Sequence, residues 1–375
     1  MKKYKLLIIS LCAALAGGCT ASSSSDNKED TYTAQSTRTV FDTVYAFSET
    51  NPDEDASKKH FKDSEKLLEK YNQLFDIYNN YDGLNNLKTV NDNAGKEPVK
   101  VDQSIIDMLN LARKFYDYSD GEFDITIGSL LNVWHNYREE GIKLNESGAK
   151  GNLPADEELK EASVHKGWDK VIIDDDANTV YITDPDVSID VGGIAKGYAT
   201  ELTAQQMEKE GMKSGYLNVG RNIRLVGKKS DGTDWRIGVA DPKGEQANGL
   251  VTIDEKDPVS VVTSGDYERY YVASDGKKYS HIIDPSTLYP AVLYHSVTII
   301  TPDSAAADCL STTLFTMSVE EGKQVLIAYE KDSGNDVQAV WVMDPDKSQN
   351  EDGKVSGDYF ITCTDGLKNN LTFTQ

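Results

Sequence analysis

An acid, two adjacent glycines and a lysine follow one another within the segment Ser188–Tyr198. The run Val187–Val191 is expected to be a strand with Asp190 at its end, and helical composition follows the glycines. Gly192–Gly193 removes two β-carbons where a backbone turns sharply or approaches a ligand. Because the first N–H groups of a helix are unpaired, this arrangement favours phosphate binding, with Lys196 as an added cation. A plain strand-to-helix turn explains the same residues, since neither nucleotide-binding glycine motif matches the spacing.

A second stretch with a possible ligand contact is Phe123–Trp134. Gly128 and Ser129 stand between two apolar runs, and a turn of small residues lets backbone amides approach a flat ligand or a phosphate. A packing corner between a strand and a helix accounts for the pair equally well. The residues from Asn136 to Ala162, rich in Glu, Lys, Gly and Asn, are expected to form a surface insertion.

Three residues in the C-terminal half could bind a metal ion or accept a proton. Asp308 and Thr312 lie four residues apart in the expected helix Ser304–Leu314, so their side chains share one helix face. Their oxygens suit a hard cation such as Mg²⁺, although such pairs are common on helices. His281 lies within the strand-like run Tyr279–Pro285, where a lone histidine is usually a core residue whose hydrogen bonds are satisfied.

Composition restricts the possible partners. The 375-residue chain has a formal net charge of −23 and a pI near 4.6. Nucleic-acid and anionic-membrane binding need clustered Lys and Arg, so the charge argues against both. An anionic nucleotide must therefore be bound by local groups such as helix N-termini, a cation or single lysines. No Cys/His cluster has zinc spacing, and Cys309 and Cys363 are expected to be small buried side chains, not a disulfide.

The N-terminus has the pattern of a secretion signal over residues 1–18. A basic start precedes the apolar stretch Leu6–Leu15, which is too short to span a bilayer. Small residues then precede Cys19, and this order resembles the lipobox of bacterial lipoproteins, in which the cysteine is lipidated; an ordinary signal peptide is the alternative. Residues 19–36 are expected to be a flexible tether and 37–375 one folded domain, placed outside the cytoplasm and lipid-anchored to the cell membrane.

Hydrophobic periodicity outlines the elements of this domain. Asp102 is a plausible N-cap for a helix that follows it, and the second half of the chain looks like a meander of short strands. The main expected elements are a strand over Thr37–Phe47, helices over Phe61–Tyr78 and Ser104–Tyr118, a hairpin over Trp168–Thr183, and strands at Gly215–Gly220, Ile223–Gly227, Trp235–Val239, Val259–Ser264 and Ser296–Thr301.

Four segments in order strongly resemble motifs of the ApbE family of FAD:protein FMN transferases, and a fifth adds the pattern Asp-Gly-x-Phe-Asp-x-Thr-x-Gly. They are Asp190–Gly197, Thr263–Arg269, Tyr279–Pro285, Ala307–Thr312 and Asp120–Gly128. The resemblance covers roughly residues 38 to 370. It implies an α+β, T-fold-related architecture of mixed and antiparallel sheets packed with helices, and an FAD cleft between sub-domains. The family is Mg²⁺-dependent, extracytoplasmic and often lipid-anchored.

The resemblance also implies roles for single positions. The side chains of Asp308 and Thr312 and the backbone carbonyl of Gly193 match the metal ligands of the family. Asp190 and Lys196 match positions that contact FAD. The remaining FAD contacts that the resemblance implies are Phe41, Tyr78, Gly128, Ser129, Leu130 and His281.

Three residues depart from the usual pattern of the family. Phe41 stands where many members have methionine at the isoalloxazine ring, and Gly193 replaces the usual alanine. Both are conservative for a stacking contact and a backbone ligand. Arg221 interrupts a pattern that usually reads Asn-x-Gly-Gly-Asn, so the resemblance leaves the conformation of the loop Gly220–Asn222 open.

The implied reaction is Mg²⁺-dependent transfer of FMN from FAD to a Ser or Thr hydroxyl of an acceptor flavoprotein, with release of AMP. His281 would act as the base, while Asp308 and Lys196 would serve the metal and the phosphates. Acceptors of the family include subunits of Na⁺-translocating quinone reductase, Rnf-type complexes and extracellular electron-transfer systems. Two alternatives stay open: a Mg²⁺-dependent FAD pyrophosphatase that releases FMN and AMP, and a non-catalytic flavin-binding lipoprotein.

Overall fold

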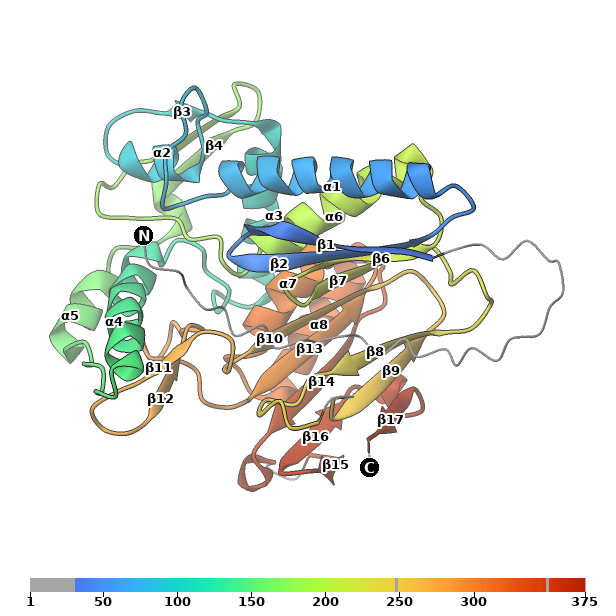
Figure 1. The fold of residues 1–375 in the computed structure, drawn as a ribbon. Helices are drawn as coiled ribbons and strands as arrows, with labels where there is room; N and C mark the ends of the chain where they lie inside the picture. The colour runs from blue at the N-terminus through green and yellow to red at the C-terminus, as the bar shows by residue number, and fades with distance from the viewer. Residues whose placement is uncertain (1–30, 247–248, 349–350, 375) are drawn as a thin grey trace, which may run out of the picture.

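The computed structural model describes residues 31–246, 249–348 and 351–374, and Figure 1 shows their arrangement. Within these residues, nine strands form one antiparallel sheet at the centre of the molecule. In sheet order they are β1 (Thr31–Val40), β2 (Thr43–Thr50), β6 (Gly215–Val219), β7 (Asn222–Val226), β10 (Ser260–Gly265), β13 (Ser296–Thr301), β14 (Gln338–Met343), β16 (Tyr359–Cys363) and β15 (Gly353–Ser356).

Both faces of the large sheet are covered, which explains why every residue of β13 is buried. Side chains that alternate along β13 enter two separate cores: Val297 and Ile299 join the helical side, and Ile300 joins the other. The helical side contains α1 (Glu54–Leu74), α3 (Gln103–Tyr118), α6 (Ala195–Glu210), α7 (Ser304–Thr313) and α8 (Val319–Ser333). The other core is shared with a small sheet of β8 (Trp235–Val239), β9 (Val251–Glu255) and β17 (Leu371–Phe373).

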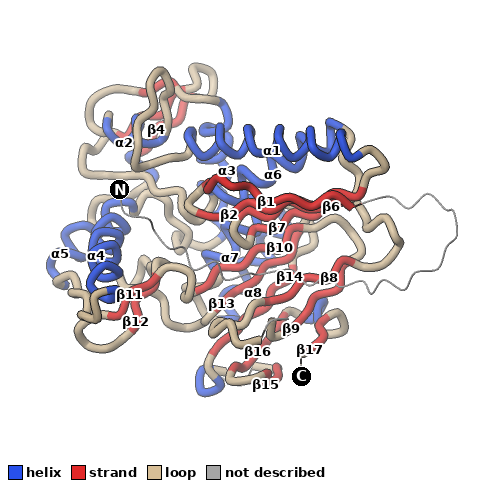
Figure 2. The backbone as a smooth tube through the Cα atoms, in the orientation of Figure 1, coloured by secondary structure: helices blue, strands red, loops and turns tan. Residues whose placement is uncertain are grey.

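Two smaller parts flank this centre, as the tube in Figure 2 makes clear. One has its own hydrophobic core between helices and a two-stranded sheet: α4 (Gly128–Glu146), α5 (Asp156–Ser163), β11 (Tyr270–Val272) and β12 (Lys278–Ser280). The other consists of α2 (Leu87–Asp92) and the sheet β3 (Val99–Lys100), β5 (Thr179–Ile182) and β4 (Val171–Asp174). Short 3₁₀ helices lie at Trp168–Lys170, Pro345–Lys347 and Asp365–Leu367.

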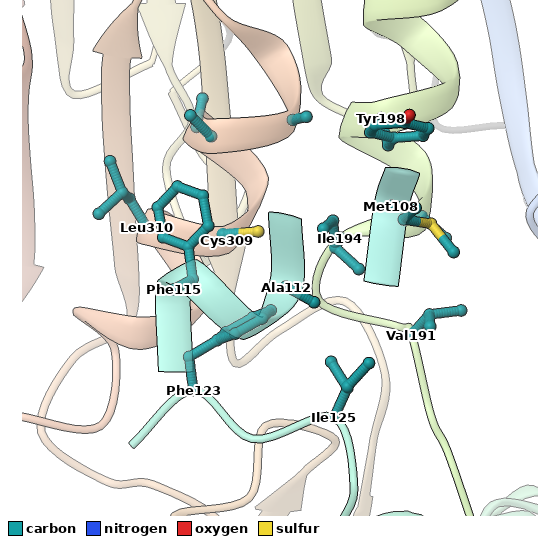
Figure 3. Close-up of a cluster of buried hydrophobic side chains, with 14 of the residues drawn as sticks. Met108, Ala112, Phe115, Phe123, Ile125, Val191, Ile194, Tyr198, Cys309 and Leu310 are labelled. Carbon is teal, nitrogen blue, oxygen red and sulfur yellow. The ribbon is translucent and has the colours of Figure 1, made fainter. Parts of the chain in front are cut away.

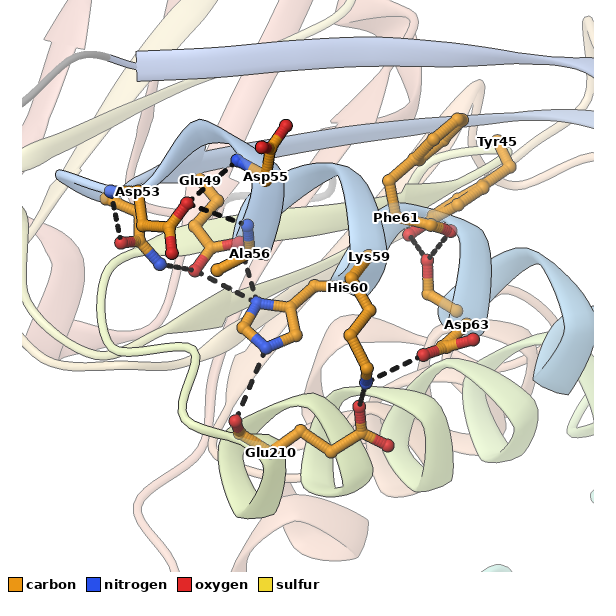
Figure 4. Close-up of polar contacts among 12 residues, drawn as sticks. Tyr45, Glu49, Asp53, Asp55, Ala56, Lys59, His60, Phe61, Asp63 and Glu210 are labelled. Carbon is orange, nitrogen blue, oxygen red and sulfur yellow. Dashed lines mark hydrogen bonds and ion pairs between the residues drawn. The ribbon is translucent and has the colours of Figure 1, made fainter.

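A buried polar group fastens α1 to its neighbours at the end of the sheet (Figure 4). The ring Nδ1 of His60 on α1 lies 2.9 Å from a carboxylate oxygen of Glu49 on β2, and both side chains are almost fully buried. The ring Nε2 lies 3.4 Å from the backbone carbonyl of Glu210, the last residue of α6. Beside it, Lys59 pairs with the Glu210 carboxylate at 2.8 Å. These contacts set the position of α6, whose other end carries the site residues.

The α+β architecture of antiparallel sheets packed with helices is confirmed. The strand Ser296–Thr301 is found at its predicted bounds, and Asp102 caps α3 by accepting the N–H of Ser104 at 3.0 Å. The hairpin over Trp168–Thr183 is found as β4 and β5. Cys309 and Cys363 are free thiols, as predicted. Cys309 is fully buried, whereas Cys363 is only partly covered.

Four expectations about local structure are wrong. The predicted strand over Thr37–Phe47 is divided by a turn at Phe41–Asp42, which connects β1 to its antiparallel partner β2. The run Val187–Val191 is not a strand, because only Ser188 forms an isolated bridge to Ile127. The predicted surface insertion over 136–162 instead contains the second half of α4, whose alternating charges cover one face of a helix that packs on its other face. Residues 31–36 belong to β1, which pairs with β2, so this part of the predicted tether is strand.

The remaining N-terminal predictions fall on residues outside the described part of the chain. They are the signal peptide over 1–18, the lipidated Cys19 and the tether up to residue 30. Among the residues that the structure describes, no helix has the length and apolar character needed to cross a bilayer.

Candidate active site

The site is built where the first turn of α6 meets α7. The backbone N–H of Gly197 donates a hydrogen bond of 2.8 Å to Oδ2 of Asp308, which is 3% exposed. The Nζ of Lys196 lies 3.9 Å from the other oxygen, Oδ1. A Cβ on Gly197 would lie 2.3 Å from the carbonyl oxygen of Ser304, so glycine permits this close helix contact. An unpaired N–H at a helix start therefore orients the carboxylate.

The other two predicted metal ligands lie next to each other. A Cβ built on Gly193 would lie 3.3 Å from Oγ1 of Thr312, so the backbone of Gly193 passes close to this hydroxyl. Thr312 follows Asp308 by one helical turn on α7. A carboxylate, a hydroxyl and a backbone carbonyl are oxygen donors only, and such a set suits Mg²⁺ better than zinc or copper. The residues present thus fit the ion that the resemblance implies.

Hydrophobic side chains fix both halves of this arrangement (Figure 3). Val191 and Ile194 enclose the glycine pair and are buried, and Cys309 is buried directly after Asp308. They pack in one cluster with Phe123 and with Phe115 of α3. Because the neighbours of each polar residue are anchored in the core, the polar side chains have little freedom to move apart.

Asp190 turns its carboxylate towards the glycines and towards several positive groups. Its oxygen accepts the N–H of Gly192 at 2.8 Å. Burial raises the pKa of Asp190, and this shift is opposed first by the Gly192 N–H and then by His135, Arg138 and Lys196. The Nζ of Lys196 also lies 3.5 Å from the Gly192 carbonyl. Asp190 and Lys196, both predicted to contact FAD, therefore lie at the same turn, each next to the backbone of Gly192.

His281 lies just beyond the end of β12, and its buried ring Nδ1 has no hydrogen-bond partner within the described residues. The interpretation as a strand histidine with satisfied hydrogen bonds is therefore wrong. Burial of the ring lowers the pKa of His281 to about 3, with further lowering by Arg138, Arg269 and Lys196. The imidazole is therefore neutral at pH 7, which is the state that a general base requires.

Two predicted aromatic contacts lie near these charges. Tyr78 is 53% exposed, and its ring stacks on that of His135 with centroids 5.0 Å apart. Burial of the phenol raises the pKa of Tyr78 to about 12, with Asp190 adding to the effect. Phe41 has a φ of 50°, a left-handed value that is rare for bulky residues. Its N–H donates to Oδ1 of Asn72 at 2.7 Å, and its carbonyl accepts from Arg269 at 3.3 Å.

The predicted small-residue turn at Gly128 is the start of α4 and corresponds to the packing corner that the sequence left open. The N–H of Gly128 donates to the Ser188 carbonyl at 2.9 Å, and a Cβ there would lie 2.4 Å from that oxygen. Ser129 donates its hydroxyl hydrogen to the Asp186 carbonyl at 2.6 Å. The side chain of Leu130 is 1% exposed and packs in the core of the α4 part, so it points away from solvent. Their predicted contact with flavin stays a prediction.

Three basic residues at the site were not assigned from the sequence: His135, Arg138 and Arg269. Arg269 stands within a motif that carried the resemblance, so its position could have been inferred. Arg138 lies in the segment that was interpreted as a surface insertion, and His135 directly precedes that segment. The buried residues Leu130, Trp134 and Arg138 recur at spacings of four, a helical pattern that could have placed this arginine on the inner face.

The resemblance left the conformation of the loop Gly220–Asn222 open. In the structure, Gly220 and Arg221 form the two-residue turn of a hairpin between β6 and β7. Val219 pairs with Asn222, and the intervening Gly220 and Arg221 both have positive φ, of 55° and 74°. This is the backbone of a type I′ turn, in which the second position usually favours glycine. Arg221 occupies it with its guanidinium 2.6 Å from the Glu268 carboxylate.

Comparisons with known proteins agree with this architecture. The model of the ApbE family matches residues 39–337. The chain belongs to the ApbE family. A relative from Vibrio cholerae named FAD:protein FMN transferase is 30% identical over 262 residues, which cover 70% of this chain and 74% of that protein. A relative of the same name from Klebsiella pneumoniae is 28% identical over 307 residues, or 80% and 89% of the two chains.

Solved structures of ApbE proteins share the fold. The crystal structure of the ApbE protein from Thermotoga maritima has a TM-score of 0.68 and 31% identity, covering 83% of this chain and 94% of that one. The flavin transferase ApbE from Vibrio cholerae has a TM-score of 0.68 and 25% identity, covering 90% and 98%. The predicted ApbE membership and the prediction of a transferase enzyme are therefore confirmed.

Proposed function

We propose that this ApbE protein transfers the FMN part of FAD to a Ser or Thr hydroxyl of an acceptor flavoprotein, in a Mg²⁺-dependent reaction that releases AMP. The names of its relatives support FMN transfer from FAD to a protein. The observation that carries the finer proposal is the junction of α6 and α7. There, the oxygen donors Asp308, Thr312 and Gly193 lie beside Lys196 at a helix start. Such groups bind metal-complexed phosphates.

The metal ligands and the lysine would divide the work of holding FAD. Asp308, Thr312 and the Gly193 carbonyl would hold Mg²⁺, which when bound neutralises charge on the diphosphate and on departing AMP. Lys196 is 28% exposed at its side chain, and its Nζ, 3.9 Å from Asp308, would bind a phosphate oxygen beside the metal. Phe41 and Tyr78 would bound the flavin or adenine ring, because aromatic faces stack on flat heterocycles.

The chemical step replaces the phosphoanhydride bond between the two halves of FAD with a phosphoester bond to the acceptor. The acceptor hydroxyl oxygen bonds to the phosphorus of the FMN half, and the bond from that phosphorus to the bridging oxygen breaks, so AMP leaves with this oxygen. The hydroxyl proton passes to a ring nitrogen of His281, which is neutral at pH 7 because burial and cations lower its pKa to about 3. General-base assistance contributes about 10²–10⁴-fold, and most of the remaining acceleration comes from positioning and charge neutralisation.

The proposal includes a location and partners. Cys19 would be lipidated and hold the domain outside the cytoplasm on the cell membrane, with the preceding residues removed as a signal peptide. The acceptors would be flavoproteins bearing a Ser/Thr flavinylation motif, such as subunits of Na⁺-translocating quinone reductase or of Rnf-type and extracellular electron-transfer complexes. Cys19→Ser should release the protein into the soluble fraction with unchanged activity; a wild-type protein that is already soluble would contradict the anchor.

The test of the reaction uses the purified chain with FAD, Mg²⁺ and a candidate acceptor domain. Covalent flavin on the acceptor is read by in-gel fluorescence, and AMP is measured in parallel. Asp308→Asn should reduce both by about 100-fold or more and should raise the Mg²⁺ concentration required. The control is Asp365→Asn, which also removes one carboxylate but at a side chain that is 94% exposed, in the 3₁₀ helix Asp365–Leu367.

The products distinguish the two alternatives. AMP and free FMN formed without any acceptor, and no fluorescent acceptor band, would establish an FAD pyrophosphatase instead. If the protein binds FAD but releases no AMP at any metal concentration tested, it is a non-catalytic flavin-binding protein. Unchanged transfer by Asp308→Asn at limiting Mg²⁺ would place the metal elsewhere.

A further inference from the structure

Arg138 on α4 is a buried cation without a carboxylate partner. Its side chain belongs to a residue that is 9% exposed, its Nε has no hydrogen-bond partner, and the ion pairs found among the described residues do not include it. Arg224 is 8% exposed and offers a direct comparison. Its guanidinium lies 3.0 Å from the carboxylate of Glu201 and 3.4 Å from that of Glu208. Buried charges are normally paired, so Arg138 lacks the anion that Arg224 has.

The one polar partner of Arg138 in the described part of the chain holds the guanidinium without neutralising it. An Nη atom of Arg138 donates to Nδ1 of His135 at 3.1 Å, one helical turn earlier. Burial and the Arg138 charge itself lower the pKa of His135, so this imidazole is neutral and accepts the hydrogen bond. The ring of His135 is in turn held by its stack on Tyr78, at 5.0 Å between centroids. The guanidinium is thus positioned in advance, and its charge remains uncompensated.

Arg138 faces the site described above. The geometric link is His135, which bonds to Arg138 at 3.1 Å and stacks on Tyr78, a predicted FAD contact. In agreement with this place, the charge of Arg138 adds to the effect of burial in lowering the pKa of His281, and it opposes the rise that burial causes in the pKa of Asp190. In a chain with a net charge of −23, Arg138 and Arg269 form a local concentration of positive charge. Arg269 is 45% exposed at its side chain, so solvent screens part of the repulsion between the two, whereas Arg138 itself is buried and forms no ion pair within the described residues.

We propose that Arg138, positioned by His135, binds a phosphate group of the dinucleotide substrate and so forms an anion subsite on α4. A guanidinium presents a planar fork of donors that matches phosphate oxygens, and the charge of Arg138 is not neutralised by a carboxylate among the described residues. This inference rests on the proposed function for the identity of the dinucleotide. Because α4 packs in a different core from α6 and α7, the substrate would be held from two separate parts of the fold.

The test compares ligands with and without phosphate on three proteins: wild type, Arg138→Gln and Lys143→Gln. Lys143 is an exposed cation on the same helix and serves as the control for loss of one positive charge. Affinities for FAD, inorganic diphosphate and riboflavin are measured by calorimetry, and melting temperatures are recorded for each protein with and without ligand. Arg138→Gln should weaken FAD and diphosphate binding by about 10- to 100-fold and should leave riboflavin binding unchanged.

A purely structural role for Arg138 predicts a different pattern. The substrate-free Arg138→Gln protein should melt at the wild-type temperature or higher, because an unpaired buried charge is removed. If it melts lower and loses FAD and riboflavin affinity equally, Arg138 is structural. If FAD and diphosphate bind Arg138→Gln as tightly as wild type, or if wild type binds neither, the subsite does not exist.

The proposed transferase function and the anion subsite can be refuted independently of each other. Wild-type protein that binds FAD through Arg138, but neither labels an acceptor nor releases AMP, would refute the transferase and leave the subsite in place. A raised KM for the acceptor protein, with FAD affinity unchanged in Arg138→Gln, would overturn the inference by assigning the arginine to the acceptor.

Discussion

Replacing Gly197 with alanine should move the candidate metal ligand without altering any polar group. In the native packing a new Cβ would lie 2.3 Å from the Ser304 carbonyl and 2.5 Å from the Cβ of Asp308. Ordinary contact begins at 3.4 Å, so α7 must retreat from α6 by about 1.1 Å along this direction. Overpacking of this size costs about 1–3 kcal/mol of stability. The same displacement lengthens the hydrogen bond from the Gly197 N–H to Asp308, now 2.8 Å.

Gly197→Ala should lose most of its transferase activity under conditions where it is still folded. A misplacement of about 1 Å in a catalytic array costs about 100-fold in rate, so FMN transfer should drop by that factor at a temperature where the protein is still folded. Stability is measured by thermal and urea unfolding, and transfer by acceptor fluorescence at saturating FAD. Gly366→Ala is the control, because its Cβ would meet the movable side-chain amide of Gln338 instead of backbone. Wild-type activity together with a lowered melting temperature would refute the coupling between helix spacing and the metal ligand.

Three further perturbations follow from the structure. The pKa of His281 is lowered to about 3 in the folded protein, so below about pH 6.5 the unfolded chain binds a proton that the folded one does not. The free energy of unfolding, measured by urea titration, should therefore decline from about pH 6.5 towards pH 3 more steeply for wild type than for His281→Asn. Arg221→Gly should be more stable than Arg221→Ala by about 1 kcal/mol, since both remove the same contacts and only alanine keeps the left-handed strain; equal stabilities would contradict this. Glu201→Gln should lower the free energy of unfolding by about 3 kcal/mol, because the buried charge of Arg224 loses a partner. Adding Arg224→Met to this variant should restore part of the lost stability in urea unfolding, since the unpaired charge is then removed.

Much of the site could be predicted because its residues are close in sequence. Asp190, Gly193 and Lys196 occupy one short segment, so any helix that starts after the glycines brings them together. Asp308 and Thr312 are related by one helical turn and required only the correct helix prediction. That these two groups meet across α6 and α7 was suggested by the resemblance and not by the pattern of either segment. The close approach at Gly197 became visible only when both helices were in place.

The errors arose where tertiary packing overrides composition. The half of α4 beyond residue 136 is rich in charged residues and contains an asparagine and a glycine, a composition typical of loops. It is nevertheless helical, because Gly141 packs against Tyr271 of β11 and the preceding Trp134 stacks on Tyr279 of β12. His281 was placed inside a strand because its neighbours are apolar, but β12 ends at Ser280. A strand of three residues is too short for its ends to be located by alternation.

The cations around His281 both lower the pKa of its imidazole and favour binding of an anionic substrate. Together with burial, Arg138, Arg269 and Lys196 hold the pKa of this histidine near 3, so a free enzyme shows no acid limb from it near its ordinary value of about 6.5. The same cations attract a diphosphate, and a bound diphosphate offsets part of their charge. The pKa of His281 should therefore rise when the dinucleotide binds, which makes the ring a stronger base only when substrate is present. The pH dependence of transfer should then show a higher acid pKa in kcat than in kcat/KM, and identical values would rule this linkage out.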